Sequence, residues 1–138
     1  MGSDEVIVLD THVLVWAVGA DRKLGRKARA LIDRHWAAGK VGVPAIVFWE
    51  IGLLQARRRL DLPSHVREWR EELLLAGLIE LPLEGMVAVR ALDLDGLPDD
   101  PADRFIVATA LVHGAALMTA DEKLLNWRHA MERHDARI

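Results

Sequence analysis

The 138-residue chain contains no cysteine. This absence excludes disulfide frameworks, thiolate zinc sites and cysteine nucleophiles, and it fits the reducing cytoplasm in which we expect the protein to act. No apolar run approaches the roughly 18 residues that suggest a membrane span, and no basic, apolar secretion signal opens the chain. We therefore expect a cytoplasmic protein that has no membrane association.

The chain also lacks an excess of positive charge. It has 18 Lys and Arg residues against 21 Asp and Glu residues, which gives a formal net charge of −3. Bulk electrostatics therefore do not predict a protein that coats nucleic acid, and any contact with RNA or DNA must be local. Basic residues cluster at 22–29 and 57–59, where they indicate solvated helix faces or helix ends, with phosphate binding as the alternative.

Length and composition favour one globular domain over residues 1–138. Of the residues, 51% are hydrophobic and 28% are charged, and the chain is long enough to bury a core without disulfides. Residues 1–3 are typical of a cloning remnant, and residues 127–138 form a polar C-terminal tail.

Short apolar stretches alternate with longer amphipathic ones. We predict strands at residues 5–9, 40–43, 78–81 and 116–118, and a further edge strand at 136–138. Helices are predicted at 12–18, 24–38, 44–58, 65–76, 84–92, 101–113 and 121–126. This alternation predicts a doubly wound α/β fold, with a parallel sheet covered by helices on both faces.

Four acidic residues fall where a ligand site is expected in such a fold. Asp10 and Asp121 follow predicted strands, at the carboxyl ends where open parallel sheets bind ligands. Glu50 and Asp103 lie on the apolar stripes of predicted helices, and an acid on a buried stripe must be paired, protonated or bound to a cation. All four can point into one crevice.

Four converging carboxylates repel one another unless a cation lies between them. Mg²⁺ and Mn²⁺ prefer oxygen ligands of this kind, and such ions can orient a phosphodiester, activate water and stabilise a leaving oxygen. The chain has no glycine-rich phosphate loop, no HExxH motif and no serine–histidine pair to suggest another chemistry. The pattern favours a metal-dependent nuclease.

Three of the acids also have purely structural explanations. Asp103 can stabilise a helix dipole behind an Asp100 cap, with Pro101 at the first helical position. Asp121 lies in a Thr-Ala-Asp-Glu sequence that matches a capping box, and Asp10 can cap the helix that follows it.

Glu50 is in the middle of a helix and has no capping role. Its structural alternative is a buried ion pair with an arginine, for which Arg104 is the candidate. Thr11 and Thr119 are expected either to cap helices or to hold a metal-bound water.

The histidines show no close ligand pairing, so each is interpreted as a surface or core residue. Trp16, Trp49 and Trp69 lie on predicted helices. They are expected in the hydrophobic core rather than as platforms for base stacking.

Four motifs together resemble the PIN-domain ribonucleases, and most of all the VapC toxins of toxin–antitoxin pairs. The resemblance covers nearly the whole chain. It rests on VIVLDTHVLVW around Asp10, VFWEIGLL around Glu50, LPDDPADRFIVATAL around Asp103 and LMTADEKLL around Asp121.

The resemblance implies a PIN-like three-layer α/β/α domain with a small parallel sheet of four or five strands. It also implies that the four acids bind Mg²⁺ or Mn²⁺ and support hydrolysis of RNA, with Thr119 as a polar accessory. Toxins of this family are expected to form homodimers and to bind an antitoxin whose tail occupies the groove beside the active site.

The function expected from the sequence is therefore a metal-dependent endoribonuclease, the toxin of a toxin–antitoxin pair. Asp10, Glu50, Asp103 and Asp121 are the expected catalytic and metal-binding residues, with Thr11, Thr119 and Arg104 as accessories. A PIN nuclease that is not a toxin is the first alternative. A receiver-like signalling domain, phosphorylated on an acid at a strand end, is the second.

Overall fold

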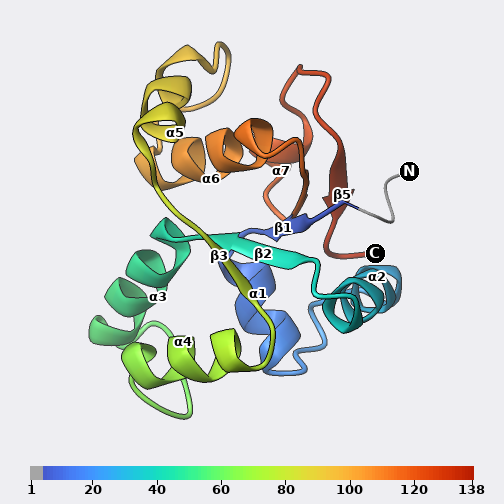
Figure 1. Ribbon diagram of the computed structural model, residues 1–138, viewed down its shortest axis with the longest axis vertical. Coiled ribbons are helices and arrows are strands. Elements are labelled where there is room, and N and C mark those ends of the chain that lie inside the picture. Colours follow the sequence, from blue (N-terminus) through green and yellow to red (C-terminus); the bar gives the residue numbers. More distant parts are fainter. Residues whose placement is uncertain (1–4) are drawn as a thin grey trace.

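The fold is built on a sheet of five strands that all run parallel (Figure 1). The computed structural model describes residues 5–138, so the expected cloning remnant at residues 1–3 lies outside the described residues. The order across the sheet is β3-β2-β1-β4-β5. The strands are β1 (Ile7–Leu9), β2 (Val41–Pro44), β3 (Ile79–Leu81), β4 (Ala116–Thr119) and β5 (Arg133–Asp135).

Helices cover both faces of this sheet, which confirms the three-layer prediction. The connections from β1 to β2 and from β2 to β3 step in one direction, so right-handed crossovers place their helices on one face. These helices are α1 (Thr11–Val18), α2 (Arg26–Ala37), α3 (Ile46–Ala56) and α4 (Val66–Leu75).

The chain then crosses back from β3 to β4, which lies on the far side of β1. This return connection runs over the opposite face, as Figure 1 shows for α5 and α6. It contains α5 (Gly85–Arg90), the short 3₁₀ helix η2 (Ala91–Asp93) and α6 (Pro101–Val112), and α7 (Glu122–Leu125) follows β4. The strand order therefore reverses between β1 and β4, and a crevice is expected at the carboxyl ends of these two strands.

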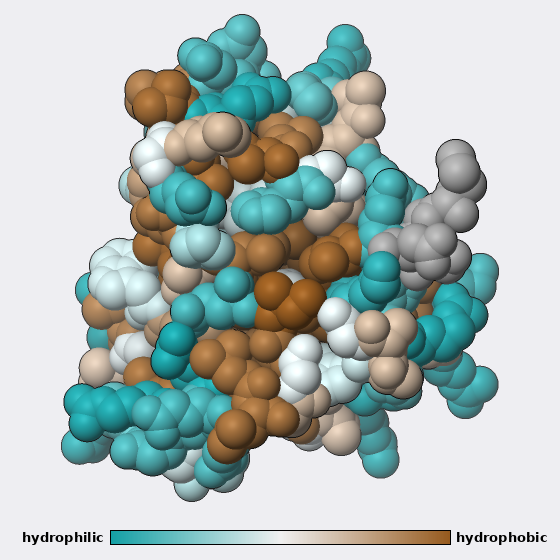
Figure 2. All heavy atoms as spheres, viewed as in Figure 1, coloured by the Kyte–Doolittle hydropathy of each residue, from teal (hydrophilic) through white to brown (hydrophobic). Residues whose placement is uncertain are grey.

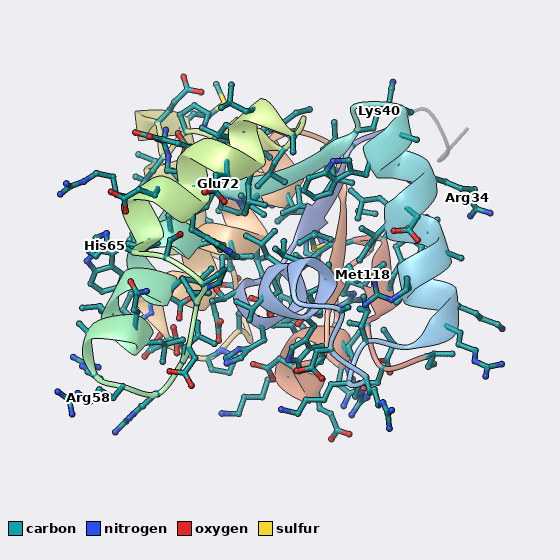
Figure 3. All side chains as sticks on the ribbon, turned by 90° about the horizontal axis from the view of Figure 1, so that it is seen from below. Arg34, Lys40, Arg58, His65, Glu72 and Met118 are labelled. Atoms are coloured by element: carbon teal, nitrogen blue, oxygen red, sulfur yellow. The ribbon has the colours of Figure 1, made fainter. Side chains whose placement is uncertain are left out.

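The core lies around the three central strands. Every residue of β1, β2 and β4 is buried, as expected for parallel strands with helices on both faces. Met118 of β4 lies in the interior, while Arg34 and Arg58 extend outward (Figure 3). Apolar residues also run through the middle of the face drawn in Figure 2, over the strands, with hydrophilic residues around them. No helix among residues 5–138 has both the length and the apolar character that a membrane crossing requires.

The prediction of an edge strand at residues 136–138 is wrong in position. The strand is β5, three residues earlier, where Leu117 of β4 pairs with Arg133. The Arg133 guanidinium donates to the carbonyls of Leu124 and Trp127 at 2.8 and 2.6 Å, which ties this polar segment to α7 and the loop that follows it. Side-chain hydrogen bonds, rather than an alternation of apolar residues, therefore determine where the last strand forms.

Candidate active site

The four predicted acids come together at the point where the strand order reverses. Asp10 follows β1 and caps α1, and Asp121 follows β4 and caps α7. Glu50 lies in the middle of α3, and Asp103 lies in the first turn of α6. All four line one cavity of about 360 Å³. The cavity is also lined by Thr11, His12, Trp16, Asp100 and Ala120.

Two buried threonines hold two of these acids in place. The Thr119 hydroxyl donates to Oδ2 of Asp10 at 2.6 Å, and the Thr11 hydroxyl donates to Oε1 of Glu50 at 2.5 Å. Thr119 Oγ1 also accepts the backbone N–H of Asp121 at 3.0 Å. The threonine side chains therefore fix the orientation of the carboxylates, while the N-caps of α1 and α7 are Asp10 and Asp121 rather than the threonines.

Burial is the main influence on the acidity of Asp10 and Glu50. It raises the pKa of Asp10, and the hydrogen bonds from Thr119 and from the Thr11 backbone oppose this rise. Burial likewise raises the pKa of Glu50, against the hydrogen bond from Thr11. Both carboxyl groups therefore lie where too few positive or hydrogen-bonding groups stabilise the charged form.

Asp103 shows the repulsion among the acids most clearly. Burial and, after it, the negative charges of Asp10, Asp100, Asp121 and Glu50 together raise its pKa from 3.8 to about 7. A carboxyl group with this pKa is half protonated near neutral pH unless positive charge enters the cavity. The cavity is therefore a strongly anionic site.

The capping roles predicted for Asp10 and Asp100 are confirmed, whereas the predicted capping box at Asp121 is not, because Asp121 itself is the N-cap of α7. Asp100 accepts the backbone N–H of Asp103 at 3.1 Å, Asp10 accepts that of Thr11 at 2.8 Å, and Asp121 accepts that of Lys123 at 2.8 Å. A carboxylate oxygen that accepts one hydrogen bond keeps a second lone pair, so capping and a place in the cavity are compatible even for Asp10, whose two oxygens both accept hydrogen bonds.

Arg104 lies elsewhere, and the alternative of an ion pair with Glu50 is wrong. Its guanidinium donates to the backbone carbonyls of Ala91 and Leu97, both at 2.9 Å. Glu50 is instead held by Thr11. Arg104 does not line the acidic cavity, and its expected role as an accessory there has no contact to support it among residues 5–138. It ties the loop before α6 to the end of α5.

The aromatic residues only partly follow the expectation of a core role. Trp69 is 2% exposed and belongs to the core, but Trp49 on α3 is 58% exposed. Trp16 packs against the core with part of its surface and lines the acidic cavity together with His12. The helical spacing of His12 and Trp16 after Asp10 is the signal in the sequence that could have placed both at the site.

The donor set fits a hard divalent cation. Every carboxylate that lines the cavity offers oxygen, and burial, with the charges of the neighbouring acids, raises the pKa of Asp103. Within residues 5–138, no three Asp, Glu or His side chains already converge as metal ligands. Mg²⁺ keeps several of its waters and is commonly held by only one or two carboxylates, for which this cavity has room.

Comparisons with known proteins agree with this geometry. A model of the PIN domain matches residues 7–129. The chain is 33% identical over 124 residues to Ribonuclease VapC22 of Mycobacterium tuberculosis, which covers 89% of this chain and 92% of that protein.

Two solved structures share the fold at low identity. DNA-bound VapBC from Salmonella typhimurium has a TM-score of 0.69 at 15% identity and covers 95% of this chain and 98% of the matched chain. VapBC2 from Rickettsia felis, bound to a DNA fragment from its promoter, has a TM-score of 0.67 at 14% identity and covers 94% and 98%. From its fold, its four acids and its relationship to a VapC protein over most of its length, the chain belongs to the PIN domain family.

Proposed function

We propose that the protein is a metal-dependent endoribonuclease that hydrolyses RNA phosphodiester bonds. The observation that carries the proposal is the convergence of Asp10, Glu50, Asp103 and Asp121 from four separate elements on one cavity. The relative in Mycobacterium tuberculosis is named a ribonuclease, which supports RNA as the substrate. We place the activity in the cytoplasm, where cellular RNA is found.

The four acids would hold the metal ion in this proposal. Bound Mg²⁺ or Mn²⁺ would supply positive charge to the phosphodiester and activate a water molecule. Asp10 and Glu50, oriented by Thr119 and Thr11, present fixed oxygens to the ion. Asp103 and Asp121 complete the anionic lining, and one of the acids orients the attacking water.

Asparagine variants test this assignment directly. Asp10→Asn and Asp103→Asn keep the side-chain shape and a hydrogen-bond acceptor but remove the charge. Each should abolish Mg²⁺- or Mn²⁺-dependent cleavage of RNA while circular dichroism stays unchanged. Asp33→Asn, at an exposed site on α2, is the matched control and should cleave as the wild type does. Undiminished cleavage by both cavity variants would refute the proposal.

We further propose that this nuclease is a toxin neutralised by an antitoxin protein. A solved structure of similar fold, from Klebsiella pneumoniae, is a toxin–antitoxin complex. An apolar groove of about 400 Å³ lies between α5 and α6, beside the loop that carries Asp100. Val89 and Leu92, which line it, are 62% and 76% exposed, and exposed apolar surface of this kind marks protein contacts.

Expression tests the toxin proposal. The wild type should arrest growth and Asp103→Asn should not, and co-expression of the protein encoded by the neighbouring gene should restore growth. Val89→Asp in the groove should weaken that rescue. Light scattering should show the expected homodimer. A wild type that cleaves RNA without affecting growth would favour the alternative, a PIN nuclease that is not a toxin. Membership of the PIN family favours either nuclease over the receiver-like domain.

A further inference from the structure

The acidic cavity has an aromatic wall that the roles above do not use. His12 and Trp16 lie four residues apart on α1, so they share one face of the helix, and both line the cavity. Their ring centroids are 6.4 Å apart and their planes are inclined by 52°. Because the rings are tilted rather than stacked, neither covers the face of the other.

Trp16 differs from Trp36 and Trp127, whose indole N–H groups are bound within the fold. Trp36 and Trp127 donate their indole N–H groups to the backbone carbonyls of Ala76 and Asp95. The indole N–H of Trp16 has no acceptor within the described part of the chain. Trp16 therefore packs against the core with part of its surface and also lines the acidic cavity.

The negative charge of the cavity favours RNA contacts that involve uncharged groups. Five carboxylates line it, and its lining contains no lysine or arginine. RNA phosphates are repelled by such a surface, so the cavity cannot hold RNA through the basic contacts that usually supply affinity. A nucleobase carries no charge, and stacking on an aromatic side chain is the sequence-tolerant contact by which proteins bind unpaired bases.

We propose that Trp16, with His12 beside it, is a stacking platform for an unpaired RNA base next to the cleaved phosphodiester. This inference rests on the proposed ribonuclease function and adds which part of the RNA the protein binds. A base in a duplex is covered by its neighbours and cannot reach the ring. The platform therefore selects single-stranded or looped RNA, and it contributes to substrate binding rather than to the chemical step.

A scan with base-free nucleotides tests the platform on the wild type. Oligoribonucleotides of one sequence, each lacking one base near the cleaved bond, are cleaved in Mn²⁺. We expect one position at which loss of the base raises KM about tenfold and leaves kcat nearly unchanged, because stacking of one base contributes about that factor. A scan in which no position affects KM would overturn the proposal.

Three variants test whether Trp16 is the residue that binds this base. Trp16→Leu removes the aromatic face but keeps an apolar side chain, and it should raise KM for the intact RNA by about tenfold. Trp16→Phe should recover most of the lost affinity. Trp49→Leu replaces an exposed tryptophan outside the cavity lining and should match the wild type.

The effects on KM of removing the base and of replacing Trp16 should not add together. In Trp16→Leu the sensitive position of the scan should become insensitive, because the base there has lost its platform. Equal KM values for Trp16→Leu and Trp49→Leu, or an undiminished effect of the missing base in Trp16→Leu, would overturn the proposal while leaving the nuclease in place. If Trp16→Leu does not fold, Trp16→Phe and the scan on the wild type decide. A wild type that never cleaves RNA would overturn both proposals.

Discussion

Replacing Asp103 with asparagine should stabilise the metal-free protein at about pH 8 but not at about pH 5. Burial, together with the charges of the neighbouring acids, raises the pKa of Asp103 from 3.8 to about 7. The folded state therefore holds the proton more tightly than the unfolded chain does. Stability from this group is fully present below pH 3.8 and is lost as the pH rises through about 7.

The size of the stability gain follows from the rise in the pKa of Asp103. A change of about 3 pKa units corresponds to a ceiling of about 4 kcal/mol, and solvent screening at this half-buried side chain reduces it to about 2 kcal/mol. Asparagine also forfeits the interaction of a first-turn carboxylate with the dipole of α6, about 0.5 kcal/mol. The net gain is then about 1.5 kcal/mol at pH 8, or about 5 °C in Tm, and close to zero at about pH 5.

Urea unfolding in EDTA, followed by tryptophan fluorescence at the two pH values, measures this difference. Asp33→Asn, with an exposed side chain, should track the wild type throughout. An Asp103→Asn variant that is no more stable than the wild type at about pH 8 would refute the account of repulsion among the acids.

Addition of Mn²⁺ should reverse the order of the two proteins. A ligand that binds only the folded state stabilises it in proportion to its affinity, and the wild type has one more carboxylate to offer. The wild type should therefore gain more stability than Asp103→Asn. An equal gain in both would place the ion away from Asp103.

Three further substitutions probe the structure around the site. Thr119→Val removes the hydroxyl that joins Asp10 to the backbone N–H of Asp121, so urea unfolding should show a loss of about 1–3 kcal/mol and RNA cleavage should fall. Leu117→Ala empties a fully buried position of β4 and should cost about 2–5 kcal/mol in the same assay. Gly25→Ala should lower Tm by displacing the C-terminal backbone, because a Cβ at this position would overlap Ile138.

The sequence was enough to predict the parallel sheet and the cavity acids because both depend on local signals. Apolar runs followed by Asp10 and Asp121 mark strand ends, and an acid on an apolar stripe marks Glu50 and Asp103. The order of strands in the sheet then brings these positions together. Family resemblance added the cation and the substrate, which local patterns alone leave open between capping and binding.

The predictions that were wrong concern residues whose position depends on tertiary contacts. The α3 sequence is apolar on nearly every side, so helical periodicity could not predict that Trp49 would be the exposed residue. Arg104 was matched to Glu50 by charge, yet the loop before α6 offers several backbone carbonyls that a guanidinium satisfies at once. The position of β5 likewise depends on Arg133, whose partners lie in a turn that the sequence alone does not place.

The use of threonine rather than arginine beside the acids has a consequence for the site. An arginine would neutralise a carboxylate and remove the demand for a cation, whereas a hydroxyl orients the oxygen and adds no formal charge. Thr11 and Thr119 therefore fix the positions of Glu50 and Asp10 without relieving the repulsion that, after burial, contributes to the raised pKa of Asp103. The fold keeps this repulsion in the metal-free state, and the Mg²⁺ or Mn²⁺ that we propose for this site would relieve it.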